Sequence, residues 1–130
     1  MDKKVVNAGS LKPGSYVIID GVACTVRNVD TSKPGKHGST KCRVEAIGMI
    51  DKQKKIFVMP TSDRVEVPII EKKAAQVLSV NNDVANVMDN ESFETFDLKI
   101  PEDLKDKIVE GVQVVYWGIL NDKVLKSLKA

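Results

Sequence analysis

The sequence TSKPGKHGSTK, residues 31–41, separates two runs with β-strand character and decides how the first half of the chain folds. It contains three lysines, two glycines, a proline and the only histidine of the chain, but no acidic residue. Glycine and proline favour turns because they supply backbone angles that strands avoid. The stretch is therefore predicted to close a β-hairpin whose lysines point away from the domain, towards an anionic partner.

Short alternating runs on both sides of this loop predict a small all-β domain. Their apolar and polar residues alternate as in half-buried strands. The predicted strands cover residues 16–19, 24–28, 42–47, 55–59 and 64–70. Asp20-Gly21 is a two-residue hairpin signal, and Cys24, Val26 and Asn28 are expected to share one face of the next strand. About five short strands without a helical period indicate an SH3-like barrel, with a small sandwich as the alternative.

The second half of the chain has a different order of elements. Strands are predicted at residues 76–80, 84–88, 93–100, 112–119 and 124–128. A helix is expected to begin at Pro101 and to end at Gly111, with Leu104, Ile108 and Val109 at helical spacing. This order is that of an OB-fold, a five-stranded barrel often used on nucleic acids. The whole chain is thus expected to be all-β, with an N-terminal SH3-like barrel followed by a C-terminal OB-fold barrel that carries one short helix.

Residues 69–73 mark the predicted domain boundary, because apolar β sequence gives way there to Glu71-Lys72-Lys73. The predicted domains are residues 1–70 and 71–130. Residues 1–69 carry 12 Lys and Arg against 7 Asp and Glu, and residues 70–130 carry 8 against 11, so the net charges are +5 and −3. The basic half is therefore the half expected to face a phosphate backbone.

Composition narrows the class of protein. With 130 residues, of which 42% are hydrophobic and 29% charged, the sequence is typical of a soluble globular protein. A cytoplasmic location without membrane contact is expected, because no apolar run has the length of a signal peptide or a membrane span. Cys24 and Cys42 could pair on spacing alone, but two free thiols are the favoured interpretation. Since a zinc site needs about four ligands, no metal site is predicted.

The loop around Lys36 does not match the common catalytic motifs. A phosphate-binding loop requires GxxxxGK[ST] before a helix, whereas His37 follows the lysine here and a strand is expected next. A hydrolase that uses His37 has weak support, since only Ser39 is a nearby nucleophile and no acidic residue orients the imidazole. On composition alone, a solvated basic hairpin and a nucleic-acid contact have about equal support. Four aromatic residues of the second half could stack on bases, although most are expected in the core: Phe93, Phe96, Tyr116 and Trp117.

The order SKPGKHGSTK, residues 32–41, resembles the modification loop of the translation initiation factor 5A family, which is related to bacterial elongation factor P. Pro34 fits the archaeal form, whereas Thr40 departs from the common alanine. Further matches lie at residues 11–14, 20–21, 60–62, 65–70 and 116–117. The family fold is an SH3-like domain followed by an OB domain, which agrees with the elements predicted above.

The resemblance implies that Lys36 is the modified lysine of the family. A separate enzyme, deoxyhypusine synthase, uses NAD to transfer an aminobutyl group from spermidine to that lysine, and hydroxylation then gives hypusine in some members. Family members bind the large ribosomal subunit beside the P-site tRNA and promote peptide-bond formation at stalled sites such as proline runs. The factor would act by positioning, so it would not be an enzyme and would need neither a cofactor nor a small-molecule substrate.

The resemblance also implies contacts on either side of Lys36. These residues would contact the tRNA, the ribosome or the modifying enzyme, and the two glycines would give the backbone its tight path. They are Lys33, Pro34, Gly35, His37, Gly38, Ser39 and Lys41. The alternative function is a non-ribosomal RNA-binding module that uses the basic loop and the OB domain, and it predicts salt-sensitive RNA binding by the unmodified protein.

Overall fold

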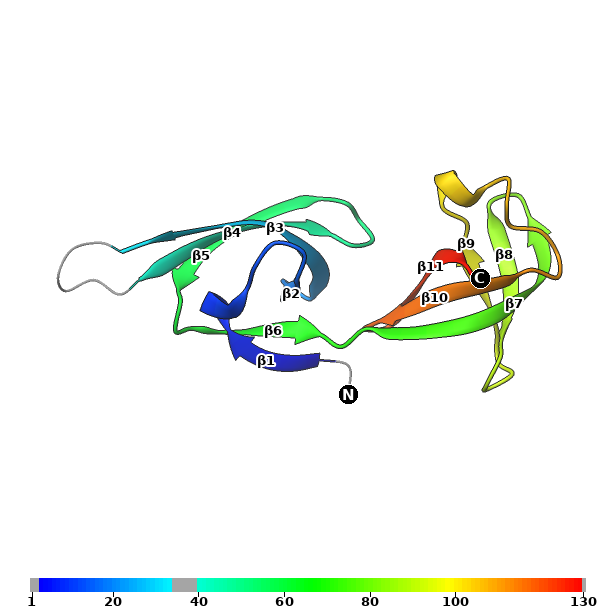
Figure 1. Cartoon of the computed structure of the whole chain (residues 1–130), viewed down its shortest axis with the longest axis horizontal. Coiled ribbons are helices and arrows are strands. Elements are labelled where there is room, and N and C mark those ends of the chain that lie inside the picture. Colours follow the sequence, from blue (N-terminus) through cyan, green and yellow to red (C-terminus); the bar gives the residue numbers. More distant parts are fainter. Residues whose placement is uncertain (1–2, 34–39, 130) are drawn as a thin grey trace. The chain divides into compact units, whose positions relative to one another are not determined.

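The computed structural model describes residues 3–33 and 40–129. The chain forms two compact units, Met1–Ile69 and Ile70–Ala130, and each unit has its own hydrophobic core. Strands dominate both units, and Figure 1 shows how the sheet of each unit curls. The prediction of an all-β fold with two β-domains is confirmed.

The first unit combines a four-stranded antiparallel sheet with a two-stranded one. Its elements are β1 (Lys3–Asn7), the 3-10 turn η1 (Ala8–Ser10), β2 (Tyr16–Ile19), β3 (Val22–Ser32), β4 (Lys41–Gly48), β5 (Lys54–Pro60) and β6 (Arg64–Pro68). The strand order is β2-β3-β4-β5 in the larger sheet, and β1 pairs with β6. All five strands predicted for this half are present. Their inward faces enclose a core in which Val17, Cys24 and Val44 are completely buried.

Strand β1 is the strand that the sequence pattern did not reveal. Val6 is its one residue packed against the core, while Val5 is 53% exposed. Antiparallel pairing with β6, from Lys3↔Pro68 to Asn7↔Arg64, holds β1 in place. A strand that is held mainly by backbone pairing with a distant segment shows little alternation in its own sequence, which is why it escaped detection.

A β-bulge in β3 changes which side chains face the core. The pairing with β4 shifts after Val26, and Arg27 is the extra residue. Beyond the bulge, Val29 packs against the core and Asn28 is exposed. The prediction that Asn28 shares a face with Cys24 and Val26 is therefore wrong, because one inserted residue reverses the alternation.

The second unit is one curled five-stranded sheet. Its strands are β7 (Glu71–Asn81), β8 (Val84–Asp89), β9 (Thr95–Lys99), β10 (Gln113–Ile119) and β11 (Asp122–Leu128). They are antiparallel in the order β11-β10-β7-β8-β9, and the two outer strands, β9 and β11, contact each other. The predicted inward row of Phe96, Leu98 and Ile100 is confirmed, since all three belong to the core of this unit.

The charged residues at the predicted domain boundary belong to a strand. Glu71-Lys72-Lys73 are the first residues of β7, and they pair with residues 116–118 of β10. Strand residues at a sheet surface can carry charged side chains while the backbone pairs. The two units divide between Ile69 and Ile70, directly before this strand.

The helix expected after Pro101 is only the 3-10 turn η2 (Glu102–Leu104). Leu104 and Ile108 are buried as the spacing predicted, but Val109 is 54% exposed. The turn is held by short-range backbone bonds, such as that from the Leu104 amide to the Pro101 carbonyl at 3.0 Å. Bonds of this i→i+3 kind rarely extend beyond one turn, so the two buried side chains are placed without a continuous helix.

Candidate functional site

The hairpin of β3 and β4 carries the loop that the sequence analysis selected. The two strands pair up to Ser32↔Lys41, and β4 pairs with β5 up to Lys41↔Pro60. The Thr61 amide also donates to the Thr40 carbonyl at 2.9 Å. Both ends of the loop are therefore anchored to the sheet, and Figure 1 shows β3 and β4 running side by side to this point.

Buried residues fix the base of the hairpin from the inside. Cys42 lies opposite Thr31 and Met59 in the register, and it is completely buried. Its Sγ donates to the Met59 carbonyl at 3.5 Å. Burial raises the pKa of the Cys42 thiol, and it raises that of Cys24 as well. Both cysteines are free, as favoured from the sequence, and both are packed as neutral core residues without nucleophilic character.

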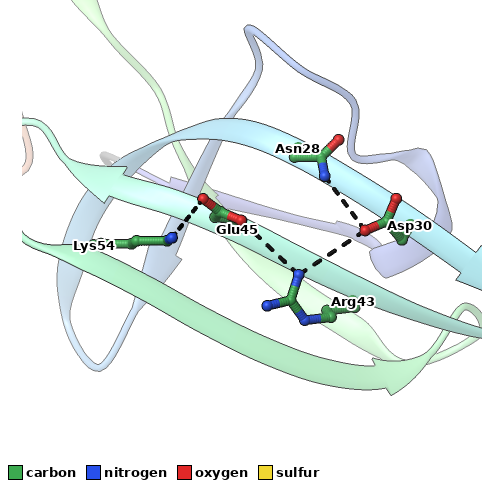
Figure 2. A network of polar contacts seen from close by, with 5 residues as sticks. All are labelled: Asn28, Asp30, Arg43, Glu45 and Lys54. Carbon is green, nitrogen blue, oxygen red and sulfur yellow. Dashed lines mark hydrogen bonds and ion pairs between the residues drawn. The ribbon is translucent and has the colours of Figure 1, made fainter.

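A chain of polar contacts crosses the outer face of the same sheet. Figure 2 shows that it links β3, β4 and β5. The Arg43 guanidinium lies 3.9 Å from both Asp30 Oδ2 and Glu45 Oε2. Glu45 Oε1 is 2.9 Å from Lys54 Nζ, and Asn28 Nδ2 donates to Asp30 Oδ2 at 3.3 Å. Exposed pairs of this kind contribute roughly 0–1 kcal/mol each to stability. They therefore add little to a hairpin that the core and the strand pairing already stabilise.

The structure places two of the predicted contact residues. Lys33 and Lys41 are exposed where the chain leaves β3 and enters β4. The proposed modification site Lys36 and the contacts Pro34, Gly35, His37, Gly38 and Ser39 lie outside the described residues. The described part of the site is therefore its frame: a long paired hairpin with a cation at each end of the loop.

The second unit contains a buried acid in the segment between two predicted strands, residues 84–88 and 93–100. Asp89 is 3% exposed at the end of β8, and its carboxylate accepts hydrogen bonds from the Tyr116 hydroxyl and the amides of Glu91 and Ser92. The bond from Tyr116 and that from the Ser92 amide lower the pKa of Asp89 to about 2. Burial raises the pKa of Tyr116, which stays a protonated donor. The sequence signal was the run Asp-Asn-Glu-Ser, since Asp side chains commonly cap the amides that follow them.

The four aromatic residues of this unit differ in burial and in the groups that they contact. Tyr116 is buried and meets the partly buried Phe96 edge-on, with ring centroids 5.0 Å apart. Trp117 lies between the ammonium groups of Lys72 and Lys126, at 4.8 and 4.5 Å from its ring centroid. Phe93 is 68% exposed and is therefore not one of the aromatic residues that pack in the core.

Metal-binding clusters and membrane-spanning helices are both absent from the described residues. Over residues 3–33 and 40–129, no group of three or more His, Cys, Asp or Glu side chains could hold a metal ion. Within the same ranges, no helix is long and apolar enough to cross a membrane.

Comparison with known proteins defines the class to which this two-domain fold and its hairpin belong. Residues 2–63 match the model of the translation initiation factor 5A-like N-terminal domain. Translation initiation factor 5A of Methanothermobacter thermautotrophicus is 48% identical over 129 residues, which cover 99% of each chain. The factor of Archaeoglobus fulgidus is 43% identical over 126 residues, covering 97% of this chain and 98% of the relative.

Solved structures of factor 5A proteins share the fold of this chain. The structure of the factor 5A from Methanococcus jannaschii superposes with a TM-score of 0.90 at 44% identity, covering 98% of this chain and 95% of the other. A family protein from Naegleria fowleri gives a TM-score of 0.79 at 28% identity, with both chains fully covered. The protein is therefore a translation factor. The chain belongs to the translation initiation factor 5A family, in agreement with the resemblance of residues 32–41.

Proposed function

We propose that the protein binds the ribosome beside the peptidyl-tRNA in the P site and promotes peptide-bond formation at stalled sites such as proline runs. Family membership over nearly the whole chain is the observation that carries this proposal. In the proposed mechanism, a side chain at the hairpin tip reaches the acceptor end of the tRNA and helps to position the reacting ends. Holding reactants in place lowers the entropic part of the barrier without any chemistry by the factor, so the protein is not an enzyme.

The proposed acting group is Lys36, extended by a spermidine-derived aminobutyl group to deoxyhypusine or hypusine. Deoxyhypusine synthase, a separate NAD-dependent enzyme, would install it, so the factor itself needs no cofactor. The extension lengthens the side chain and adds a second cationic nitrogen, which suits a phosphate-rich crevice. The exposed Lys33 and Lys41 at the ends of the loop support this assignment, because both add positive charge beside the same loop.

The paired base of the β3–β4 hairpin suits the proposed role of Lys36, whose side chain would have to enter both the modifying enzyme and the ribosome. β3 and β4 pair up to the last residues before the loop, and Cys42 of β4 packs its side chain into the core. A stiff base lowers the ordering cost of presenting a long side chain. Translation takes place in the cytoplasm, which is the proposed location.

Two measurements test this function. Intact mass of the protein from its native host is expected to exceed the sequence mass by one aminobutyl group, with or without an oxygen. An unmodified native protein would contradict the modification. Replacing Lys36→Arg is expected to abolish support of translation through proline runs in cells while leaving the unfolding free energy within about 0.5 kcal/mol, as is usual for surface positions. Lys52→Arg, at an exposed turn in the same unit, is the matched control and is expected to retain function.

A further inference from the structure

A surface pocket of about 460 Å³ lies in the second unit, whereas the β3–β4 hairpin belongs to the first. Its volume is within the range of ligand sites. The lining residues come from β7, β8, β10, the β8–β9 turn and the chain after β11: Gln76, Met88, Asn90, Phe93, Gln113 and Lys129. The pocket therefore combines three amides, one aromatic ring, one thioether and one ammonium group.

Four of these residues form a row that crosses neighbouring strands. Gln76 of β7 pairs with Met88 of β8 on one side and with Gln113 of β10 on the other. The Lys129 amide donates to the Gln113 carbonyl at 2.9 Å, so Lys129 continues the row. Because neighbouring strands lie about 4.8 Å apart, the row is roughly 14 Å long. An extended peptide segment of about four residues has the same length, at about 3.3 Å per residue.

The turn that carries Phe93 is held in an unusual conformation. Phe93 has a backbone φ of 62°, in the left-handed region that a bulky residue rarely adopts, and its side chain is 68% exposed. Buried Asp89 fixes this turn through the amides of Glu91 and Ser92, and the Phe93 amide donates to the Asp89 carbonyl at 3.0 Å. An exposed aromatic ring beside polar groups is typical of a protein-binding surface, and a fixed backbone lowers the cost of ordering it.

The amides of the pocket keep hydrogen-bonding groups for a ligand. Within residues 3–33 and 40–129, Gln76 has no side-chain hydrogen bond to another residue. The Asn90 amide donates to Gln113 Oε1 at 2.7 Å, which leaves the Gln113 donors for other contacts. A primary amide offers both donors and acceptors, so it can bind the C=O and the N–H groups of an extended backbone. Such contacts do not depend on the side chains of the ligand.

Opposite charges flank the pocket on its two sides. In the strand order β11-β10-β7-β8-β9, Lys129 follows β11, whereas Glu91 and Glu94 lie in the turn after β8. All three side chains are exposed, and none of them forms an ion pair within the part of the chain that the structure describes. The pocket is therefore complementary to a ligand that carries a carboxylate towards β11 and a cation towards the β8–β9 turn.

We propose that this pocket binds an extended segment of a partner protein, in which an aromatic side chain stands between an acidic and a basic residue. The aromatic side chain packs on Phe93 and on the Met88 thioether, since sulfur and aromatic rings attract each other. The amides of Gln76 and Gln113 bind the backbone of the segment. Lys129 pairs with its acidic residue, and the carboxylates of the turn pair with its basic one. This site goes beyond the proposed function, because it needs neither the β3–β4 loop nor its modification.

The test begins with the full-length, unmodified protein and a display library of random heptapeptides. Peptides that bind the parent but not Phe93→Ala are expected to share one aromatic residue with an acid on one side and a base on the other. For one enriched peptide, Phe93→Ala is expected to raise the dissociation constant about fivefold or more, as at other interface anchors. Phe93→Tyr keeps the ring and is expected to bind as the parent does. Val109→Ala, a similarly exposed apolar position in the same unit, is the matched control and is expected to change nothing.

Charge reversal tests the orientation of the segment. Lys129→Glu is expected to weaken binding of the same peptide about threefold, because the pair is exposed. A peptide whose acidic residue is replaced by lysine is expected to regain that loss on Lys129→Glu but not on the parent. Lys107→Glu makes the same change of charge at another exposed position of the second unit and is expected to have no effect. Equal weakening by the two variants would show a general effect of charge and would overturn the proposed pairing.

Thermal unfolding of each variant checks that the fold is intact, and NMR locates the bound peptide. The side-chain amide signals of Gln76 and Gln113 and the backbone amide of Phe93 are expected to shift. The absence of enriched peptides, equal binding by Phe93→Ala and the parent, or shifts confined to the first unit would overturn the proposal. So would equal affinity for free phenylalanine amide, which reports a small-molecule site, or full displacement of the peptide by equimolar hexauridylate, which reports a nucleic-acid site.

Discussion

Two hairpins of this protein present exposed side chains, and they are held in different ways. The β3–β4 hairpin is anchored by strand pairing, by the buried side chain of Cys42 in β4 and by ion pairs on the outer face. The β8–β9 hairpin is instead fixed by one buried carboxylate, Asp89, which accepts three hydrogen bonds. The loop between β3 and β4 is thus held at its base, whereas the β8–β9 turn has its own backbone fixed.

The largest expected effect in this comparison is the loss of the buried carboxylate. Asp89→Ala removes the acceptor of the Tyr116 hydroxyl and of two backbone amides, so the second unit is expected to lose about 3 kcal/mol of unfolding free energy, at about 1 kcal/mol per bond. Urea unfolding followed by the fluorescence of Trp117, which lies in that unit, measures this loss.

The matched control is Asp97→Ala in β9, whose carboxylate is exposed and accepts one bond, from Asn86 at 2.9 Å. Its expected cost is below about 1 kcal/mol. Equal losses in the two variants would mean that the carboxylate does not hold the turn, and the contrast between the hairpins would fail.

The pH dependence of stability is the next effect in size. The folded-state pKa of Asp89 is about 2, below its ordinary value of 3.8, so its stabilisation is complete above pH 5 and is lost as the pH falls through 2. The shift corresponds to about 2 kcal/mol. Unfolding free energies at pH 6 and pH 2 are expected to differ by that much more in the parent than in Asp89→Asn. A parallel pH dependence of the two proteins would show that Asp89 carries no such shift.

A smaller effect is expected at the base of the β3–β4 hairpin. Arg43→Ala removes two contacts of 3.9 Å on an exposed face, so it is expected to cost less than about 1 kcal/mol. Chemical unfolding of the first unit, followed by circular dichroism in low and high salt, provides the measurement. Lys52→Ala is the control for a general change of charge. A loss comparable to that of Asp89→Ala would show that surface ion pairs, not the core and strand pairing, hold this hairpin.

The smallest expected effect is a gain in the stability of the second unit. Phe93→Gly relieves a left-handed backbone at φ 62° and is expected to stabilise the second unit by up to about 1 kcal/mol. Asn82→Gly, at φ 58° in the β7–β8 turn, is expected to gain less, because Asn tolerates this conformation. Thermal unfolding of both variants tests the difference. A marked loss of stability in Phe93→Gly would indicate that the ring packs on the sheet instead of serving a ligand.

Much of the fold could be predicted because most strands have one buried face. The alternation in residues 42–47 gave β4, and the row from Phe96 to Ile100 gave the inward face of β9. The exceptions share a cause, which is that long-range pairing overrode the local pattern. β1 exists because β6 lies beside it, and Glu71 begins β7 because β10 pairs with it. Sequence alone showed neither partner.

The candidate sites also differ in whether a local sequence pattern or long-range strand pairing forms them. The glycine-framed lysine loop is a local motif, so residues 31–41 were enough to select it, and its resemblance to factor 5A agreed with the comparisons. The pocket around Phe93 joins residues from five segments that the sheet register brings together. No local pattern could show that Gln76 and Gln113 are neighbours.

The sequence by itself determined the two β-domains and the loop at residues 31–41, because strand alternation and turn chemistry are properties of adjacent residues. The family came from the resemblance of residues 32–41 to a known loop. Only the tertiary structure decided that Arg27 is a bulge, that Phe93 is exposed and that Asp89 is a buried acceptor. Those outcomes depend on burial and on hydrogen-bond partners that are far away along the chain, and such partners exist only once the sheet has formed.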